Sequence, residues 1–92
     1  MFRLWAKEFK NNKLLRDIVV ENNSATQTRT QKVFAAIDEI CYEFDLSRPI
    51  WLDQNIKEFQ RIDKTRFHSD NFIDAVEFDY LEIHVIEEDH SL

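Results

Sequence analysis

The side chains of this 92-residue chain that could do chemistry are three histidines, one cysteine and many carboxylates. A metal site needs three or four converging His, Cys, Asp or Glu ligands. His68, Asp70 and Asp74 form the one local cluster, and their spacing matches no established ligand set. His84 shares a face of a predicted strand with Glu82, so the geometry allows a metal-linked pair there. One alternative for this chain is therefore a metal-dependent protein or enzyme that uses His68, Asp70 and His84.

Neither the cysteine nor the carboxylates point to a catalytic centre. A reactive thiolate needs a helix N-terminus or a nearby cation, whereas Cys41 falls late in a predicted helix, on its apolar side, and is expected in the core. No carboxylate can be identified as buried, as acid–base catalysis by a carboxylate pair requires. The chain has no Gly, which excludes a P-loop, a dinucleotide fingerprint and a nucleophile elbow. We expect no cofactor and favour a protein that is not an enzyme.

The charge of the chain is distributed unevenly. The net charge is −6, yet all twelve Lys and Arg residues lie at or before Arg66. Residues 67–92 hold eight acids and no Lys or Arg. Such a segment attracts basic partners and repels phosphate, so a second alternative is an acidic mimic of nucleic acid that acts on a basic partner. The N-terminal segment does mix basic residues with Trp5 and Phe9, but the acidic whole disfavours nucleic acid as a partner.

The sequence carries no sign of a membrane or an export route. No stretch approaches the ~20 apolar residues that span a bilayer. Arg3, Lys7 and Glu8 place charges where a signal peptide needs an apolar run, and a lone Cys suits a reducing compartment. We expect a cytoplasmic protein without a membrane partner.

The first part of the chain predicts a β-hairpin. Its aromatic residues also have a helical spacing, but Asn11-Asn12 separates two apolar-rich runs, 2–9 and 14–21. Asn tolerates positive φ better than other non-Gly residues and suits a two-residue turn.

The pairing that such a turn implies is only partly favourable. It places Trp5 opposite Ile18, a good cross-strand pair, but it also sets Lys7 opposite Arg16. We therefore expect a bulge or a longer turn.

An amphipathic helix over 29–45 is the clearest predicted element. A capping box fits either Ser24 with Gln27 or Thr28 with Gln31. At 100° per residue one apolar stripe contains Val33, Phe34, Ile37, Ile40, Cys41 and Phe44.

A second, shorter helix and one extended segment come next. Asp53 is the predicted cap of this helix, and Leu52, Ile56 and Phe59 its buried face. Residues 64–67 are expected to be extended.

The last predicted strand covers about 76–87 and alternates clearly between two faces. One face has Leu81, Ile83 and Val85, and the other has Tyr80, Glu82 and His84. We expect this strand at an edge of the sheet, where a partner strand or a two-fold copy could add.

The order strand-strand-helix-helix-strand-strand predicts an α+β domain, in which an antiparallel sheet carries helices on one face. A chain of this length makes one domain, 1–92. Residues 88–92 are expected to form a flexible acidic tail.

The segments 39–52, 64–67 and 78–83, with Trp5–Lys7 and Lys10–Asp17, form a pattern that runs nearly end to end. This pattern resembles a family of small, uncharacterised bacterial proteins. The resemblance implies a single cytoplasmic domain. It transfers no activity and assigns no catalytic residue.

The sequence thus favours a small non-enzymatic domain with a role in protein–protein interaction or in structure. Its expected partner is another protein or a second copy of the chain. The candidate interaction residues are Arg48, Trp51, Tyr80, Glu82 and His84.

Overall fold

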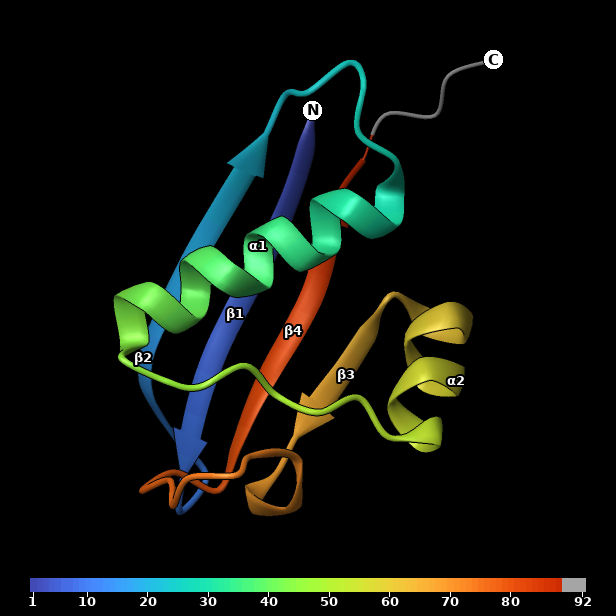
Figure 1. The fold of residues 1–92 in the computed structure, drawn as a ribbon. Coiled ribbons are helices and arrows are strands. Elements are labelled where there is room, and N and C mark those ends of the chain that lie inside the picture. The colour runs from blue at the N-terminus through green and yellow to red at the C-terminus, as the bar shows by residue number, and fades with distance from the viewer. Residues whose placement is uncertain (89–92) are drawn as a thin grey trace.

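The chain folds into a four-stranded antiparallel sheet with two helices packed on it, which confirms the predicted α+β class (Figure 1). The structure is a computed structural model and describes residues 1–88. The elements are β1 (Phe2–Lys10), β2 (Lys13–Asn22), α1 (Arg29–Phe44), α2 (Asp53–Ile62), β3 (Lys64–Phe67) and β4 (Tyr80–Glu87). A short 3-10 helix, Ser69–Asn71, lies between β3 and β4.

The turn between β1 and β2 forms at the predicted place. Asn11 and Asn12 take the left-handed conformation, with φ of 52° and 63°. Two consecutive left-handed residues match the right-handed twist of the flanking strands, as a type I′ turn does. Asn supplies this geometry in a chain without Gly.

The expected bulge is present, and it changes the cross-strand pairing from the one that a two-residue turn alone implies. Phe9 pairs with Leu14, but Glu8 pairs with Arg16, so that Leu15 is left as the extra residue. Trp5 therefore pairs with Val19, and the predicted Trp5–Ile18 pair is wrong.

β4 lies inside the sheet, so the prediction that this strand forms an edge is wrong. The strand order is β2-β1-β4-β3, and β4 pairs with β1 on one side and with β3 on the other. Its buried Leu81 and Ile83 explain the central position. β4 also begins at Tyr80 rather than near Val76. Phe78, which precedes the strand, is buried, and its ring centroid lies 5.7 Å from that of Phe72.

α1 begins at the Thr28–Gln31 capping box, one of the two predicted. Thr28 Oγ1 accepts the Gln31 N–H at 3.1 Å, and Gln31 Oε1 accepts the Thr28 N–H at 2.9 Å. Asp45, with φ of 53°, ends the helix. The buried stripe differs from the prediction at one position, because Phe34 lies at its margin and is half exposed while Ala36 is buried instead.

α2 buries a different face from the predicted one. Leu52, and not Asp53, occupies the N-cap position, and its N–H donates to Asn55 Oδ1 at 3.1 Å. Leu52 and Ile56 are exposed, whereas Asn55 and Phe59 are buried. The prediction was wrong because Asn55 finds hydrogen-bond partners far away in the sequence, which a spacing of apolar residues does not reveal.

Asn55 and Asn71 form a buried amide pair where α2, β3 and the 3-10 helix meet. Asn71 Nδ2 donates to Asn55 Oδ1 at 2.9 Å and to the Ile50 carbonyl at 2.7 Å. Asn55 Nδ2 donates to Thr65 Oγ1 and to the Arg66 carbonyl, each at 2.9 Å. Both amides are at most 2% exposed, so these partners replace the water that they give up on folding.

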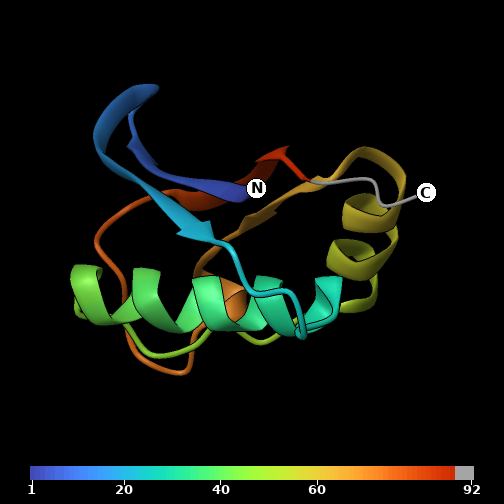
Figure 2. The ribbon, with the colours of Figure 1, turned by 90° about the horizontal axis from the view of Figure 1, so that it is seen from above.

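The two helices leave one face of the sheet uncovered (Figure 2). α1 crosses the sheet, and α2 lies beside β3. The even-numbered side chains of β1 from Phe2 to Glu8 are buried on the side of the helices, so the odd-numbered ones point to the opposite surface, which we call the open face. In the part of the chain that the structure describes, no helix is long and apolar enough to cross a membrane.

Replacing Asn71 tests the amide pair. Asn71→Ala is expected to lower the free energy of unfolding by about 2–4 kcal/mol, because the substitution strips partners from buried groups and leaves a cavity. Urea denaturation measures the change. The matched control is Asn23→Ala, an exposed Asn whose loss should stay within about 0.5 kcal/mol. Similar losses for the two variants would contradict the assignment.

Candidate functional site

The predicted interaction residues lie on two different surfaces. Tyr80, Glu82 and His84 lie on the open face, as their alternation in β4 predicts. Trp51 lines a groove between α1 and α2. Arg48 belongs to neither surface: it is exposed in the connection between the helices and its Nε lies 2.7 Å from Asp38 Oδ1.

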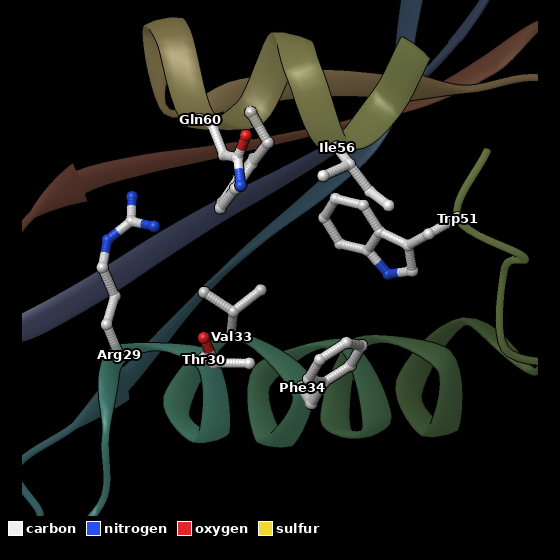
Figure 3. A pocket seen from close by; sticks show the side chains of 8 residues that line it. Arg29, Thr30, Val33, Phe34, Trp51, Ile56 and Gln60 are labelled. Carbon is white, nitrogen blue, oxygen red and sulfur yellow. The ribbon is translucent and has the colours of Figure 1, made fainter. Parts of the chain in front are cut away.

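The groove between the helices is mostly apolar and has a volume of about 290 Å³ (Figure 3). We call it the inter-helix groove. It is lined by Arg29, Thr30, Val33, Phe34, Trp51, Ile56, Phe59 and Gln60. Phe34 and Ile56 are 50% and 42% exposed, so apolar surface is available to a partner without any rearrangement of the core.

Trp51 forms one wall of the inter-helix groove and is fixed by three aromatic rings. Its ring centroid lies 6.1 Å from that of Phe34, 5.4 Å from that of Phe59 and 5.1 Å from that of Phe67, all edge to face. Such pairs hold a ring in one orientation. Trp51 is therefore both a support of the core and a contact surface of the groove.

The amide pair holds the backbone on both sides of Trp51. Asn71 binds the Ile50 carbonyl, and the Ile50 N–H donates back to the Asn71 carbonyl at 2.6 Å. On the other side, Asn55 Oδ1 accepts the Leu52 N–H. A polar network in the core thus positions the aromatic wall of the groove.

Arg29 closes the opposite end of the inter-helix groove. Its guanidinium contacts Asp63 Oδ1 at 2.6 Å and Glu88 Oε2 at 2.9 Å, and lies 5.2 Å from the centre of the Phe59 ring. Because Arg29 at the start of α1 pairs with Asp63 at the end of α2 and with Glu88 after β4, it links these three elements at this end of the groove. Glu88, predicted to belong to a flexible tail, is one of these partners; residues 89–92 of that tail lie outside the described residues.

The open face carries aromatic rings on its two central strands. Phe9 of β1 and Tyr80 of β4 stack with ring centroids 5.1 Å apart. Trp5 Nε1 donates to Asp17 Oδ2 at 2.8 Å, and Lys7 Nζ lies 3.9 Å from the Trp5 ring centre. Each ring already has a partner within the chain.

Glu82 lies at the centre of the open face between two cations. Its carboxylate is 3.0 Å from Lys7 Nζ and 3.0 Å from Arg66 Nε, and the residue is 5% exposed. Burial alone would raise the pKa of Glu82, but the hydrogen bonds and charges of Lys7 and Arg66 outweigh burial and lower the pKa. An ionised, doubly paired carboxylate is a poor general base, and it stabilises the packing of β1, β4 and β3 as an ion pair.

His84 sits in a locally positive environment. Burial lowers its pKa, and the charges of Lys64 and Lys7 lower it further, against the opposite effect of Glu82. His84 pairs with Lys64 across the β3–β4 ladder. His68 lies four residues after Lys64, directly beyond the end of β3. At ~3.3 Å per residue the two histidines are about 13 Å apart along the strand.

The structure does not bring the suggested metal ligands together. Asp70 lies in the 3-10 helix and His68 directly precedes it, while His84 is farther along β4. Within residues 1–88, no group of three or more His, Cys, Asp or Glu side chains could hold a metal ion. The His68 ring instead lies 5.7 Å from the ring of Tyr80.

The carboxylates that suggested a nucleic-acid mimic are divided between environments. Glu82 is neutralised at the centre of the open face, and Asp79 Oδ2 accepts the Asn11 N–H at 2.8 Å beside the hairpin turn. Glu77 borders a different hollow, near the end of α1. These three acids therefore do not form one surface.

That second hollow, of about 630 Å³, contains an ion pair that sequence reasoning missed. Glu8 is 3% exposed and accepts from Arg16 Nε at 2.8 Å and from Arg16 Nη2 at 3.1 Å. Arg16 Nη2 also donates to the Phe44 carbonyl at 2.9 Å. The pair joins the hairpin to the last turn of α1, where a cation is favourable. The bulge that makes Glu8 and Arg16 neighbours was predicted, but its position was not.

Cys41 is a core residue, as predicted. It is 5% exposed, and its Sγ donates to the Ser47 carbonyl at 3.6 Å. Burial, and secondarily the charge of Asp38, raises the pKa of the thiol to about 11. This environment suppresses the thiolate that a nucleophile requires.

Comparisons with protein-family models, with curated proteins and with solved structures found no match to this chain. The resemblance to a family of small bacterial proteins therefore stays a prediction. A function for this chain has to be inferred from the geometry of its two surfaces.

Alkylation of Cys41 tests the burial of the thiol. Because the thiolate forms only as the pH rises through about 11, iodoacetamide near pH 8 should modify the folded protein at least roughly 100-fold more slowly than the urea-unfolded chain. Mass spectrometry of timed samples measures both rates. The unfolded chain is the control for reagent and pH. Equal rates in the two states would contradict a buried, protonated thiol.

Proposed function

We propose that this protein is a non-enzymatic interaction domain, and that its inter-helix groove binds a basic, amphipathic segment of a partner protein. The observation that carries the proposal is the apolar groove itself, with Trp51 as a fixed wall and the half-exposed side chains of Phe34 and Ile56 at its rim. Fixed aromatic surface is the kind of contact on which interfaces depend most. A groove between two helices suits apolar side chains presented at helical spacing.

The charge of the whole layer of helices and connections, and not of the groove lining, favours a basic partner; among the described residues, Arg29 is the one charged residue that lines the groove. The connections and helices over 23–63 hold seven acids and five Lys or Arg residues, and 68–79 holds four acids and no Lys or Arg. The layer that contains the groove therefore accounts for an excess of six negative charges, as many as the whole chain. Complementary charge favours the encounter with a basic segment and disfavours an acidic one.

We also propose a cytoplasmic location for this interaction. The one Cys of the sequence is unpaired and buried, which is compatible with a reducing compartment.

Selection of binding peptides tests the proposal directly. Random peptides displayed on phage and selected on the folded protein should converge on sequences that combine Lys or Arg with apolar residues three or four positions apart. Synthetic copies of the enriched peptides should bind with a change in tryptophan fluorescence, because Trp51 lines the groove. Enrichment of acidic sequences, or of no common pattern, would refute the proposal.

A pair of matched variants locates the binding site. Phe34→Ser removes a ring from the groove and should weaken the selected peptides roughly 10- to 50-fold, as expected for the loss of one buried apolar contact. Tyr42→Ser removes an aromatic side chain from the same helix, 84% exposed and outside the groove, and should change affinity less than about twofold. Titration calorimetry measures both, with circular dichroism to verify folding. Equal affinity for the two variants would place the site elsewhere.

A further inference from the structure

The open face is organised in rows that run across all four strands. One row is ionic and alternates in sign from β2 to β3. In the order β2, β1, β4, β3 it consists of Asp17, Lys7, Glu82 and Arg66.

The rows on either side of the ionic row are largely apolar and aromatic. Leu14, Phe9 and Tyr80 form one of them. Val19 and Trp5 begin the other, which ends in His84 and Lys64. The face thus presents apolar rows that flank a strip of alternating charge.

This alternation makes the open face complementary to itself. Two sheets that pack face to face keep their strands nearly aligned. If a two-fold axis runs parallel to the strands, β2 of one copy lies over β3 of the other, and β1 lies over β4. Asp17 then faces Arg66 of the second copy, and both of these side chains are exposed. Lys7 lies over Glu82 of the second copy, where the charges are also opposite, although these two side chains are largely covered within their own chain.

A two-fold axis in another direction does not bring the opposite charges together. If the two-fold axis runs across the strands, each strand lies over its own copy. With that axis over the ionic row, each charge meets its own copy. With that axis midway between the ionic row and the row of Trp5 and His84, these two rows meet, and Arg66 is set against Lys64 of the second copy. Both arrangements bring like charges together. A displacement in the other direction sets the ionic row against the row of Leu14, Phe9 and Tyr80, which offers no opposite charge. The axis parallel to the strands is the one of these arrangements that brings opposite charges together.

We propose that two copies of this chain associate through their open faces, about a two-fold axis parallel to the strands. The apolar rows supply the contact: Phe9 lies over Tyr80 of the second copy, and Trp5 lies over its His84. The ionic row fixes the register. The helices that line the inter-helix groove lie on the other side of the sheet, so the groove stays accessible in such a dimer (Figure 2).

The area of the open face determines the affinity that we expect for the dimer. Four strands at ~4.8 Å and about eight residues at ~3.4 Å give roughly 500 Å² per copy, or about 1,000 Å² in total. This area is at the lower end of specific interfaces, so a dissociation constant in the micromolar range is expected. The association should be reversible and concentration-dependent.

Sedimentation velocity over protein concentrations from about 5 µM to about 1 mM tests the association. The unmodified chain should shift from monomer to dimer over this range. Asp17→Arg and Arg66→Asp each place like charges across the interface, and each should weaken the dimer at least tenfold. A chain that remains monomeric at the highest concentration overturns the proposal.

Mixing the two variants distinguishes the proposed interface from a loss of folding. In a mixed dimer, Arg at position 17 of one copy faces Asp at position 66 of the other, and the remaining pair is the native Asp17 with Arg66. The mixture should therefore form dimers although neither variant does so alone. Failure of the mixture to associate, with both variants folded by circular dichroism, overturns the proposed register.

A control on α2 separates this proposal from a general effect of charge and from the function of the groove. Asp53→Arg and Lys57→Asp change charge by the same amounts on a helix away from the open face, and neither should alter the dimer. Phe34→Ser should likewise leave the dimer unchanged, even if it abolishes peptide binding. A dimer that responds to these variants as strongly as to Asp17→Arg overturns the proposal and leaves the groove proposal to its own test.

Discussion

A pair of amides buried in the core, Asn55 and Asn71, holds together the part of the molecule that the sheet alone does not organise. Their hydrogen bonds tie α2, β3 and the 3-10 helix to the backbone on both sides of Trp51. Because each amide is shielded from water, the loss of one partner leaves the other unsatisfied, and the arrangement is held as a unit. The wall of the inter-helix groove therefore depends on polar contacts that lie beneath it.

The elements of this fold could be predicted from the sequence where local interactions decide them. Asn11-Asn12 marks the hairpin, and Thr28 with Gln31 marks the start of α1, because the turn and the cap involve only nearby residues. The position of β4 in the sheet could not be predicted, since strand order depends on contacts between segments far apart in the sequence. Asn55 was missed for the same reason: its partners lie 10 to 16 residues away.

The candidate site shows the same division. Alternation along β4 correctly placed Tyr80, Glu82 and His84 on one face, but the cations that neutralise Glu82 come from β1 and β3. Phe34 fitted the apolar stripe of α1, and only the position of α2 shows that it borders a groove instead of the core. The two sides of the sheet consequently differ in character. The helices and their connections hold the excess negative charge of the chain and form the groove. The open face holds aromatic rings and paired charges of both signs.

The bulge opposite Glu8 and Phe9 bears on how the length of this protein can vary. Leu15 is the one residue of β2 without a partner in β1, and it is 52% exposed. A chain that lacked this residue would keep Arg16 opposite Glu8 and Lys7 opposite Asp17, with the same side chains on each face. The hairpin therefore has one site at which its length can change by one residue without a change in the pairing of its other residues. A deletion anywhere in 16–21 would instead exchange the two faces for part of β2.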